Sequence, residues 1–264
     1  MYYKSFFSRF VFRRKLWRKV TGKLQYYSRK VFKDEFEDLR FVFDAAQIEP
    51  EVIVDGGANI GFVTHQFRKS FPKAKIISIE PSDKVFQKLK EAYKADTAVL
   101  PLNVGISAAP GTMEFNVNAN TGTSSFLHPN AYHASHLAKT KLETRTIRTI
   151  SLDSLAAENN LDRIDILKLD IEGYELEALK GAEALLAKQH VRAILLEVNL
   201  IESYERQPLF FEIAAYLHQR NYFAFNFYGF HESKLRQSIL TNLIFLSGDF
   251  RNRIKDRFGN ECGW

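Results

Sequence analysis

The sequence contains very little cysteine: Cys262 is the only one among 264 residues. A single thiol excludes a disulfide framework and a zinc site built on several cysteines, and it fits a reducing, cytoplasmic compartment. The chain also lacks any apolar run that approaches the roughly 20 residues needed to span a bilayer. Because 45% of its residues are hydrophobic, it can still bury a core, and one α/β domain of this length is ordinary.

Acidic residues are absent from the first 33 positions, which carry eleven Lys or Arg. The whole chain has a formal charge of +6, so residues 34–264 sum to −5. The first 33 residues also include ten aromatics, and their basic residues interrupt the continuous apolar core that a signal peptide has. We therefore divide the chain into a basic, aromatic N-terminal extension, 1–33, and a single domain, 34–264.

The extension has two interpretations. Six of its apolar residues fall near one side of a helix: Phe6, Phe7, Phe10, Trp17, Val20 and Leu24. Such a helix can lie on the cytoplasmic face of an anionic membrane, with aromatic rings inserted and Lys and Arg at the headgroups. Alternatively, it packs on its own domain. Nucleic acid is not an expected partner, because no recognition motif accompanies the charge.

From residue 34 onwards, short apolar strands alternate with amphipathic helices, and no internal repeat occurs. Strands are predicted at 51–55, 75–80, within 97–107, and at 111–118, 144–150, 164–170 and 191–198. Helices are predicted at 34–47, 60–70, 82–94, 151–160, 174–188 and 208–219. Two last strands, 222–228 and 242–247, are expected to pair antiparallel. This order predicts an α/β, Rossmann-like three-layer sandwich with a mostly parallel sheet of about seven strands.

The segment "VIVDGGANIGF" (52–62) places a carboxylate and three glycines directly after a β-branched run. In parallel sheets, ligands bind beyond the carboxyl ends of the strands, where Asp55 through Gly61 would lie. Glu80 ends the next strand, where its carboxylate can accept hydrogen bonds from two ribose hydroxyls. NAD(P) and S-adenosylmethionine both fit this much, since Gly56-x-Ala58-x-x-Gly61 imitates a dinucleotide fingerprint. Asp55 opposes a pyrophosphate and suits the amino group and sulfonium of S-adenosylmethionine, which we therefore predict as the cofactor.

Four stretches of the sequence carry a resemblance to known enzymes. "VDGGANIGF" resembles motif I of class I S-adenosylmethionine-dependent methyltransferases, and "ISIEPSDKVFQKLKE" resembles their motif II. "TISLDSL" together with "IDILKLDIEGYELEALKGAEALL" resembles the signature of the FkbM-type methyltransferases, which O-methylate sugars and other hydroxyl-bearing natural products. The resemblance covers residues 50–200, outside the extension. It implies an O-methyltransferase whose acceptor is a hydroxyl of a sugar, glycan precursor or similar small molecule.

Carried over position by position, the resemblance implies a cofactor site. Asp55, Gly57, Asn59 and Gly61 would surround the methionine moiety, flanked by Gly56 and Ala58. Glu80 would hold the ribose, with Pro81 and Ser82 beside it. Asn103 would lie near the adenine.

The same resemblance places Asp170, at the end of the strand 164–170, between cofactor and acceptor. Methyl transfer needs an aligned nucleophilic oxygen whose proton is removed, and we predict Asp170, or else Glu172, as the base. Lys168 is expected to pair with Asp170 or to stabilise a developing alkoxide. Two alternatives stay open: the two acids cap the following helix, or Asp170, Glu172 and Glu197 gather a divalent metal. Our interpretation requires no metal.

Acceptor contacts are predicted from the polar insertion 119–142 and from the end of the strand 191–198. The residues are Ser124, Ser125, His133, His136, Glu197 and Asn199. An insertion beside the carboxyl edge suits a cover over the substrate, although such side chains can also be solvated or cap turns. Two rival functions remain: a nicotinamide-dependent oxidoreductase and a non-catalytic membrane or partner adaptor. Retention of the acid and glycine motif disfavours the adaptor.

Overall fold

The computed structural model of the protein describes residues 34–118, 121–131, 134 and 143–259. The predicted extension 1–33 and the two histidines predicted to contact the acceptor, His133 and His136, therefore lie outside the described residues. Within the described ranges, no helix is long and apolar enough to cross a membrane.

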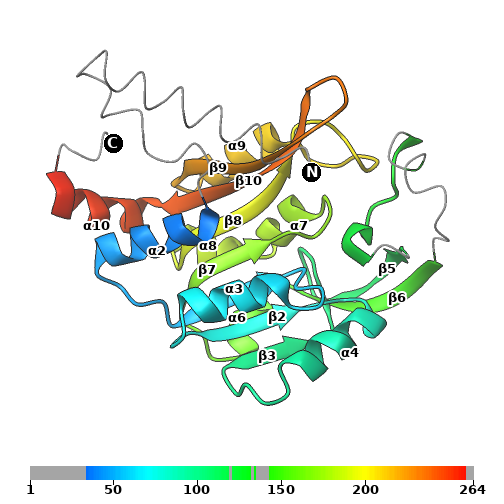
Figure 1. Ribbon diagram of the computed structural model, residues 1–264, viewed down its shortest axis with the longest axis horizontal. Coiled ribbons are helices and arrows are strands. Elements are labelled where there is room, and N and C mark those ends of the chain that lie inside the picture. Colours follow the sequence, from blue (N-terminus) through cyan, green and yellow to red (C-terminus); the bar gives the residue numbers. More distant parts are fainter. Residues whose placement is uncertain (1–33, 119–120, 132–133, 135–142, 260–264) are drawn as a thin grey trace, which may run out of the picture. The chain divides into compact units, whose positions relative to one another are not determined.

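The main sheet has seven strands in the order β3-β2-β1-β7-β8-β10-β9 (Figure 1). Five neighbouring strands are parallel: β3 (Val99–Leu102), β2 (Lys75–Ile79), β1 (Val52–Gly56), β7 (Ile164–Leu169) and β8 (Val191–Asn199). Two antiparallel strands complete the sheet: β10 (Ser238–Ser247), which pairs with β8, and β9 (Tyr222–Glu232). This confirms the predicted fold class. The strand order reverses between β1 and β7, which is where such sheets bind ligands.

Helices cover both faces of the sheet (Figure 1). One face carries α2 (Glu35–Ala46), α3 (Phe62–Ser70) and α10 (Gly248–Phe258). The other carries α6 (Leu152–Glu158), α7 (Glu175–Lys180), α8 (Glu183–Ala187) and α9 (Phe210–His218). A further helix, α4 (Asp83–Ala92), contacts β3.

One helical prediction needs correction, and one helix was not predicted. The single helix expected over 174–188 is two helices, α7 and α8, which meet at Gly181. Glycine has a low helix propensity, and here its missing side chain lets the chain pass the carbonyl of Ser107, which a Cβ atom would overlap. The helix α10 was not predicted, although Phe250, Ile254 and Phe258 repeat at the four-residue spacing of a helix face.

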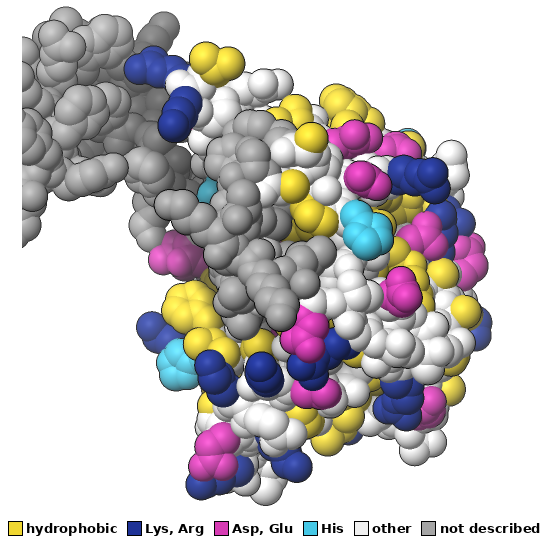
Figure 2. Space-filling model, turned by 90° about the vertical axis from the view of Figure 1, so that its right-hand side faces the viewer, with side chains coloured by type: hydrophobic (Ala, Val, Ile, Leu, Met, Phe, Trp, Pro, Cys, Tyr) yellow, Lys and Arg dark blue, Asp and Glu magenta, His cyan; other side chains and the backbone are white. Residues whose placement is uncertain are grey.

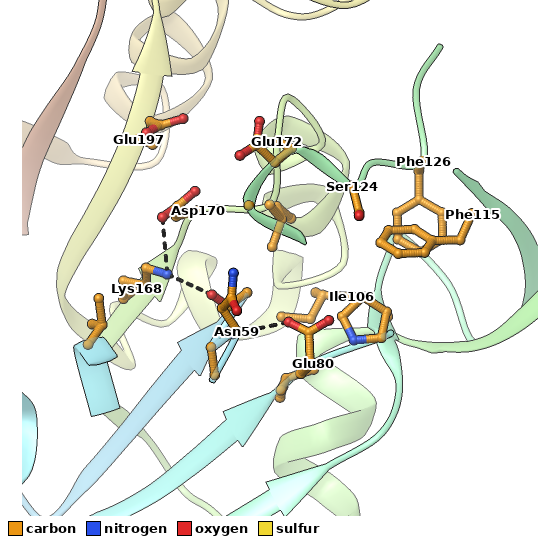
Figure 3. Close-up of a pocket in the computed structure, with 18 of the residues that line it drawn as sticks. Asn59, Glu80, Ile106, Phe115, Ser124, Phe126, Lys168, Asp170, Glu172 and Glu197 are labelled. Carbon is orange, nitrogen blue, oxygen red and sulfur yellow. Dashed lines mark hydrogen bonds and ion pairs between the residues drawn. The ribbon is translucent and has the colours of Figure 1, made fainter. Parts of the chain in front are cut away.

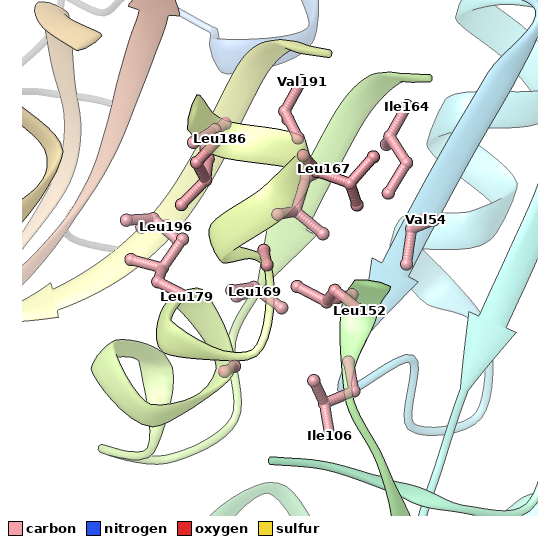
Figure 4. Packing of buried hydrophobic residues seen from close by; sticks show 14 of the residues in the cluster. Val54, Ile106, Leu152, Ile164, Leu167, Leu169, Leu179, Leu186, Val191 and Leu196 are labelled. Atoms are coloured by element: carbon pink, nitrogen blue, oxygen red, sulfur yellow. The ribbon is translucent and has the colours of Figure 1, made fainter. Parts of the chain in front are cut away.

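Successive residues of the central strands face opposite layers, because side chains alternate along a strand. On β1, Val54 packs in the cluster with α6 to α9, whereas Ile53 packs in the cluster with α2, α3 and α10. On β7, Leu167 and Leu169 join the first cluster and Ile166 the second. Figure 4 shows the first cluster closing between the strands and the helices. The polar residues of these strand ends follow the same alternation, which decides which of them meet.

A second, smaller sheet was not predicted. It consists of β4 (Gly105–Ile106), β5 (Gly111–Val117) and β6 (Glu143–Ile150), in the order β4-β6-β5. The stretch 97–107, expected to hold one strand, therefore contributes to both sheets. In Figure 1 the small sheet lies beside the carboxyl ends of the main strands. It adds a side wall at the edge where ligands are expected.

Candidate functional site

A cavity of about 280 Å³ opens beyond the carboxyl ends of the central strands (Figure 3). Its lining comes from the loops after β1, β2 and β7, from β8 and from the small sheet with its following loop. Polar lining residues are Asn59, Glu80, Ser124, Lys168, Asp170, Glu172 and Glu197. Apolar or small lining residues are Gly57, Ala58, Phe62, Val63, Ile79, Pro81, Gly105, Ile106, Phe115, Gly122, Phe126 and Ile171.

The loop after β1 approaches the cavity closely because of its glycines. Gly57 has φ +74°, and a Cβ atom there would overlap the carbonyl oxygen of Asp170, so only glycine fits. Gly61 has φ +96° and packs against the ring of Tyr93, outside the cavity lining. Gly56 likewise lies beneath the cavity, against Leu169. Of the predicted glycines, Gly57 therefore borders the ligand space, and the other two shape the turn.

Glu80 is buried, and its carboxylate is held from two sides. Oε2 accepts a hydrogen bond from the backbone N–H of Asn59 (3.0 Å), and Oε1 accepts one from that of Ser82 (2.8 Å). Burial raises the pKa of Glu80 to about 7, although these two bonds oppose the shift. Asn103 donates through Nδ2 to the carbonyls of Glu80 (3.0 Å) and Pro81 (3.1 Å). Ser82 and Asn103 are absent from the cavity lining, so in this structure they position Glu80 rather than border the ligand space.

Asp55 is not among the residues that line the cavity, and its contact with the cofactor stays a prediction. The residue is fully buried, and its Oδ2 accepts a hydrogen bond from Thr64 Oγ1 (2.7 Å), whose oxygen also lies 2.9 Å from Ser78 Oγ. Its Oδ1 lies 3.4 Å from Lys168 Nζ. Asp55 and Lys168 are register partners on β1 and β7, so the sheet itself brings the two charges together. The Asp55 carboxylate therefore belongs to the buried polar groups below the cavity, which form the floor of the site.

Lys168 is buried at the centre of this floor, and its predicted pairing with Asp170 is confirmed. Its Nζ lies 3.4 Å from Asp170 Oδ2 and donates to the carbonyls of Gly56 (3.2 Å) and Gly57 (3.1 Å). Burial lowers the pKa of Lys168, but Asp170 and Asp55 outweigh that effect, so the pKa is raised and the amine stays charged. Lys168 thus links the β1 loop to the end of β7.

Three carboxyl groups converge above Lys168 (Figure 3). One oxygen from each of Asp170, Glu172 and Glu197 lies within 4.8 Å of the others. Burial raises the pKa of Glu172 well above its usual range, and the nearby charges of Asp170 and Glu197 raise it further. Burial and Asp170 raise the pKa of Glu197 to about 8. Oxygen ligands from two strand ends fit a hard divalent cation, so the metal alternative stays open.

Glu172 has an unusual backbone conformation, and two residues bind it: Ser125, which was predicted to contact the acceptor, and Tyr204, which the sequence did not reveal. The φ of Glu172 is +56°, which is uncommon for a residue other than glycine. Tyr204 donates its hydroxyl to Glu172 Oε2 (2.8 Å), and Ser125 Oγ donates to the carbonyl of Glu172 (2.7 Å). Tyr204 lies 32 positions away in sequence, and no local pattern connects the two.

The expectation that Asp170 and Glu172 cap the following helix is wrong. Tyr174 occupies the cap position of α7 and makes no side-chain cap. Instead, the buried Glu175 accepts hydrogen bonds through Oε1 from the backbone N–H groups of Ile171 (2.9 Å) and Gly173 (3.3 Å). Because Glu175 closes this turn, the carboxyl groups before it are available to the cavity.

The predicted acceptor contacts separate into two groups. Ser124 and Glu197 line the cavity, and Ser124 Oγ also accepts the backbone N–H of Asn118 (3.0 Å). Ser125 and Asn199 do not line it: Ser125 fixes Glu172, and Asn199 Oδ1 lies 3.5 Å from Ser203 Oγ.

An aromatic wall of the cavity was not predicted. It consists of Phe115 and Phe126, whose ring centroids lie 5.1 Å apart. The alternating pattern of 111–118 contained the signal for Phe115 facing inward.

Comparisons with known proteins identify the family of this chain. A family model described as the methyltransferase FkbM domain matches residues 55–224. The hexuronic acid methyltransferase AglP of Haloferax volcanii is 32% identical over 166 residues, which are 62% of this chain and 62% of AglP. The match thus spans less than two thirds of that relative. The 2-O-methyltransferase NoeI of Sinorhizobium fredii is 26% identical over 163 residues, 59% of this chain and 66% of NoeI. Among solved structures, the match to magnesium protoporphyrin IX methyltransferase from Synechocystis PCC 6803 spans 80% of this chain and 77% of that protein. The sequence identity is 12% and the TM-score is 0.46.

Proposed function

Because this chain belongs to the FkbM family of S-adenosylmethionine-dependent methyltransferases, we propose that it methylates a hydroxyl group of a sugar or similar acceptor. The observation that carries the proposal is the order of acids along the sheet edge. Glu80 follows β2, Asp170 follows β7 and Glu197 belongs to β8, so Asp170 lies between the other two (Figure 3). We assign the Glu80 side to the cofactor and the Glu197 side to the acceptor.

The cofactor side has the donors and acceptors that S-adenosylmethionine requires. Glu80 would accept hydrogen bonds from the ribose hydroxyls, and the backbone from Gly57 to Asn59 would lie along the methionine moiety. The bound cofactor supplies a methyl group activated by its sulfonium. The carboxyl oxygens that line the site favour the binding of that positive charge.

We assign Asp170 as the base that would remove the proton of the acceptor hydroxyl. The hydroxyl oxygen would then bond to the methyl carbon as the bond between that carbon and the cofactor's sulfur breaks, which leaves a neutral thioether. The side chain of Asp170 is 38% exposed at the cavity, and Lys168 holds one of its oxygens at 3.4 Å. Lys168 is already engaged by two carbonyls and two carboxylates, so we assign it to orienting Asp170. Glu172, fixed by Tyr204, is the second candidate for the base.

The lining also bears on which acceptor fits. Glu172 and Glu197, whose pKa values are raised, can donate hydrogen bonds as neutral acids and accept them as carboxylates. The rings of Phe115 and Phe126 present an apolar wall beside them. A neutral or amine-bearing sugar suits this surface, whereas the carboxylate of a hexuronate, the acceptor named for AglP, would be repelled by each of the three acids that is ionised.

Methyl transfer from tritiated S-adenosylmethionine to a panel of neutral, amino and uronic glycosides and cellular glycans tests the proposal. Asp170→Asn should retain cofactor affinity and lose about 10²–10⁴ in turnover, whereas Asp162→Asn, an exposed control at the opposite edge, should match the wild type. Near-normal turnover of Asp170→Asn would transfer the base role to Glu172 or to a histidine of the insertion. Calorimetric binding of NAD(P) in place of S-adenosylmethionine would restore the oxidoreductase alternative.

We also propose that residues 1–33 hold the enzyme on the cytoplasmic face of an anionic membrane. The support is their composition: eleven basic residues, ten aromatics and no acid, joined to a domain of net negative charge. Deleting residues 1–33 should weaken binding to anionic vesicles and leave S-adenosylmethionine affinity unchanged. Unchanged vesicle binding after the deletion would show that the extension does not make this contact.

A further inference from the structure

An exposed apolar surface outside the cavity lining is formed by β9, by the hairpin turn that joins it to β10, and by the start of α9. Leu235 is 89% exposed, Phe211 70%, Phe230 54% and Phe227 40%. We call these four residues the hairpin patch. Its rings are contiguous: Phe227 stacks on Phe230 with centroids 6.0 Å apart, and Phe210 bridges Phe211 (5.2 Å) to Phe227 (5.7 Å). Exposed apolar groups gathered in this way mark an interaction surface.

Two cations flank the most exposed member of the patch. Lys234 and Arg236 stand on either side of Leu235 in the turn, which the bond from Ser233 N–H to the Gln237 carbonyl (2.8 Å) closes. Both are exposed, and among the described residues neither forms an ion pair. An exposed leucine between two unpaired cations suits the surface of an anionic bilayer, which has an apolar interior and negatively charged headgroups.

The hairpin rises from the same edge of the sheet as the cavity. Leu240 of β10 pairs with Asn199 at the carboxyl end of β8, two residues beyond Glu197. In Figure 1 the hairpin is the highest described element, and at the top of Figure 2 hydrophobic and basic side chains lie next to one another. The start of α2 is also near, since Asn242 donates to Glu35 (3.3 Å) and Tyr228 to Asp38 (2.8 Å).

We propose that the hairpin patch docks the domain onto an anionic lipid bilayer, with Leu235 inserted and Lys234 and Arg236 at the headgroups. A bilayer accommodates both kinds of side chain at once. If a second copy of the chain covered the patch with its own patch, the Lys234 and Arg236 of the two copies would repel one another. The extension would also be repelled, because it carries eleven basic residues and no acid. The inference concerns the folded domain, and it depends neither on the proposed reaction nor on the extension alone.

The test uses the full-length protein and sedimentation with vesicles of equal parts phosphatidylcholine and phosphatidylserine. Leu235→Ser should lower the partition coefficient about tenfold or more, the effect of losing one inserted leucine. The double variant Lys234→Ser/Arg236→Ser should lower it about fivefold per charge, and less at high salt. Phe258→Ser, an exposed apolar residue at the far end of α10, is the matched control and should change nothing. Cofactor binding should be the same in all variants, which establishes that each is folded.

Three results would overturn the proposal. In the first, the full-length protein fails to sediment with these vesicles at low salt. In the second, Leu235→Ser binds the vesicles like the wild type, which would assign all binding to the extension. A loss in Phe258→Ser as large as that in Leu235→Ser would show that the effect is not specific to the hairpin.

Discussion

Replacing Lys168 tests the centre of the site most directly. The ammonium group lies 3.4 Å from a carboxylate oxygen of both Asp55 and Asp170 and donates to two carbonyls. Lys168→Met keeps an unbranched side chain only one atom shorter but leaves Asp55, which is fully buried, without its counter-charge. Removing one partner of a buried ion pair costs about 3–5 kcal/mol. Asp170 adds little to that figure, because its side chain is 38% exposed and water can solvate it.

Urea unfolding at neutral pH measures this change through the midpoint, with the slope expected to stay constant. Lys188→Met, an exposed lysine at the opposite edge, serves as the control and should change the free energy of unfolding by less than about 0.5 kcal/mol. The double variant Asp55→Asn/Lys168→Met should be more stable than Lys168→Met alone, because the unpaired charge is removed. A cost below about 1 kcal/mol for Lys168→Met, or no recovery in the double variant, would refute the assignment of Lys168 as the counter-charge of Asp55.

Three further variants test other parts of the site. Glu80→Ala should weaken S-adenosylmethionine binding by about 1–3 kcal/mol in calorimetry, and unchanged affinity in a folded variant would contradict the ribose assignment. The pKa of Glu197 is raised from 4.5 to about 8, so between these values the folded state holds a proton that the unfolded state has lost, and the free energy of unfolding falls as the pH rises. Glu197→Gln should flatten that pH dependence. If its free energy of unfolding, measured by urea unfolding at several pH values, fell with pH as steeply as that of the wild type, the prediction would be wrong. Tyr204→Phe should lower the free energy of unfolding by about 1–2 kcal/mol, since Glu172 loses its hydroxyl donor; an equally stable variant would show that the bond is not important.

Much of the architecture could be predicted from the sequence because its determinants are local. The strands around Val54 and Leu167 are continuous apolar runs, and the helices between them repeat apolar residues at helical spacing, so alternation alone indicates a covered parallel sheet. The place of the ligand follows from the same logic, since acids and glycines after successive parallel strands reach one edge. Gly57 was predictable as a close approach, because a glycine in that turn accepts a backbone conformation that other residues avoid.

Which polar groups face the ligand was decided only by tertiary structure. Asp55 and Lys168 meet because β1 and β7 are neighbours in register, and this pairing makes a buried ion pair that the sequence did not predict. Tyr204 reaches Glu172 from a distant loop. The environment of a charge depends on which strands lie beside it and how deeply they bury it, and these are properties of packing between segments far apart in sequence. The alternation of a strand establishes that Lys168 and Leu169 face opposite ways; only the assembled sheet establishes what each of them meets.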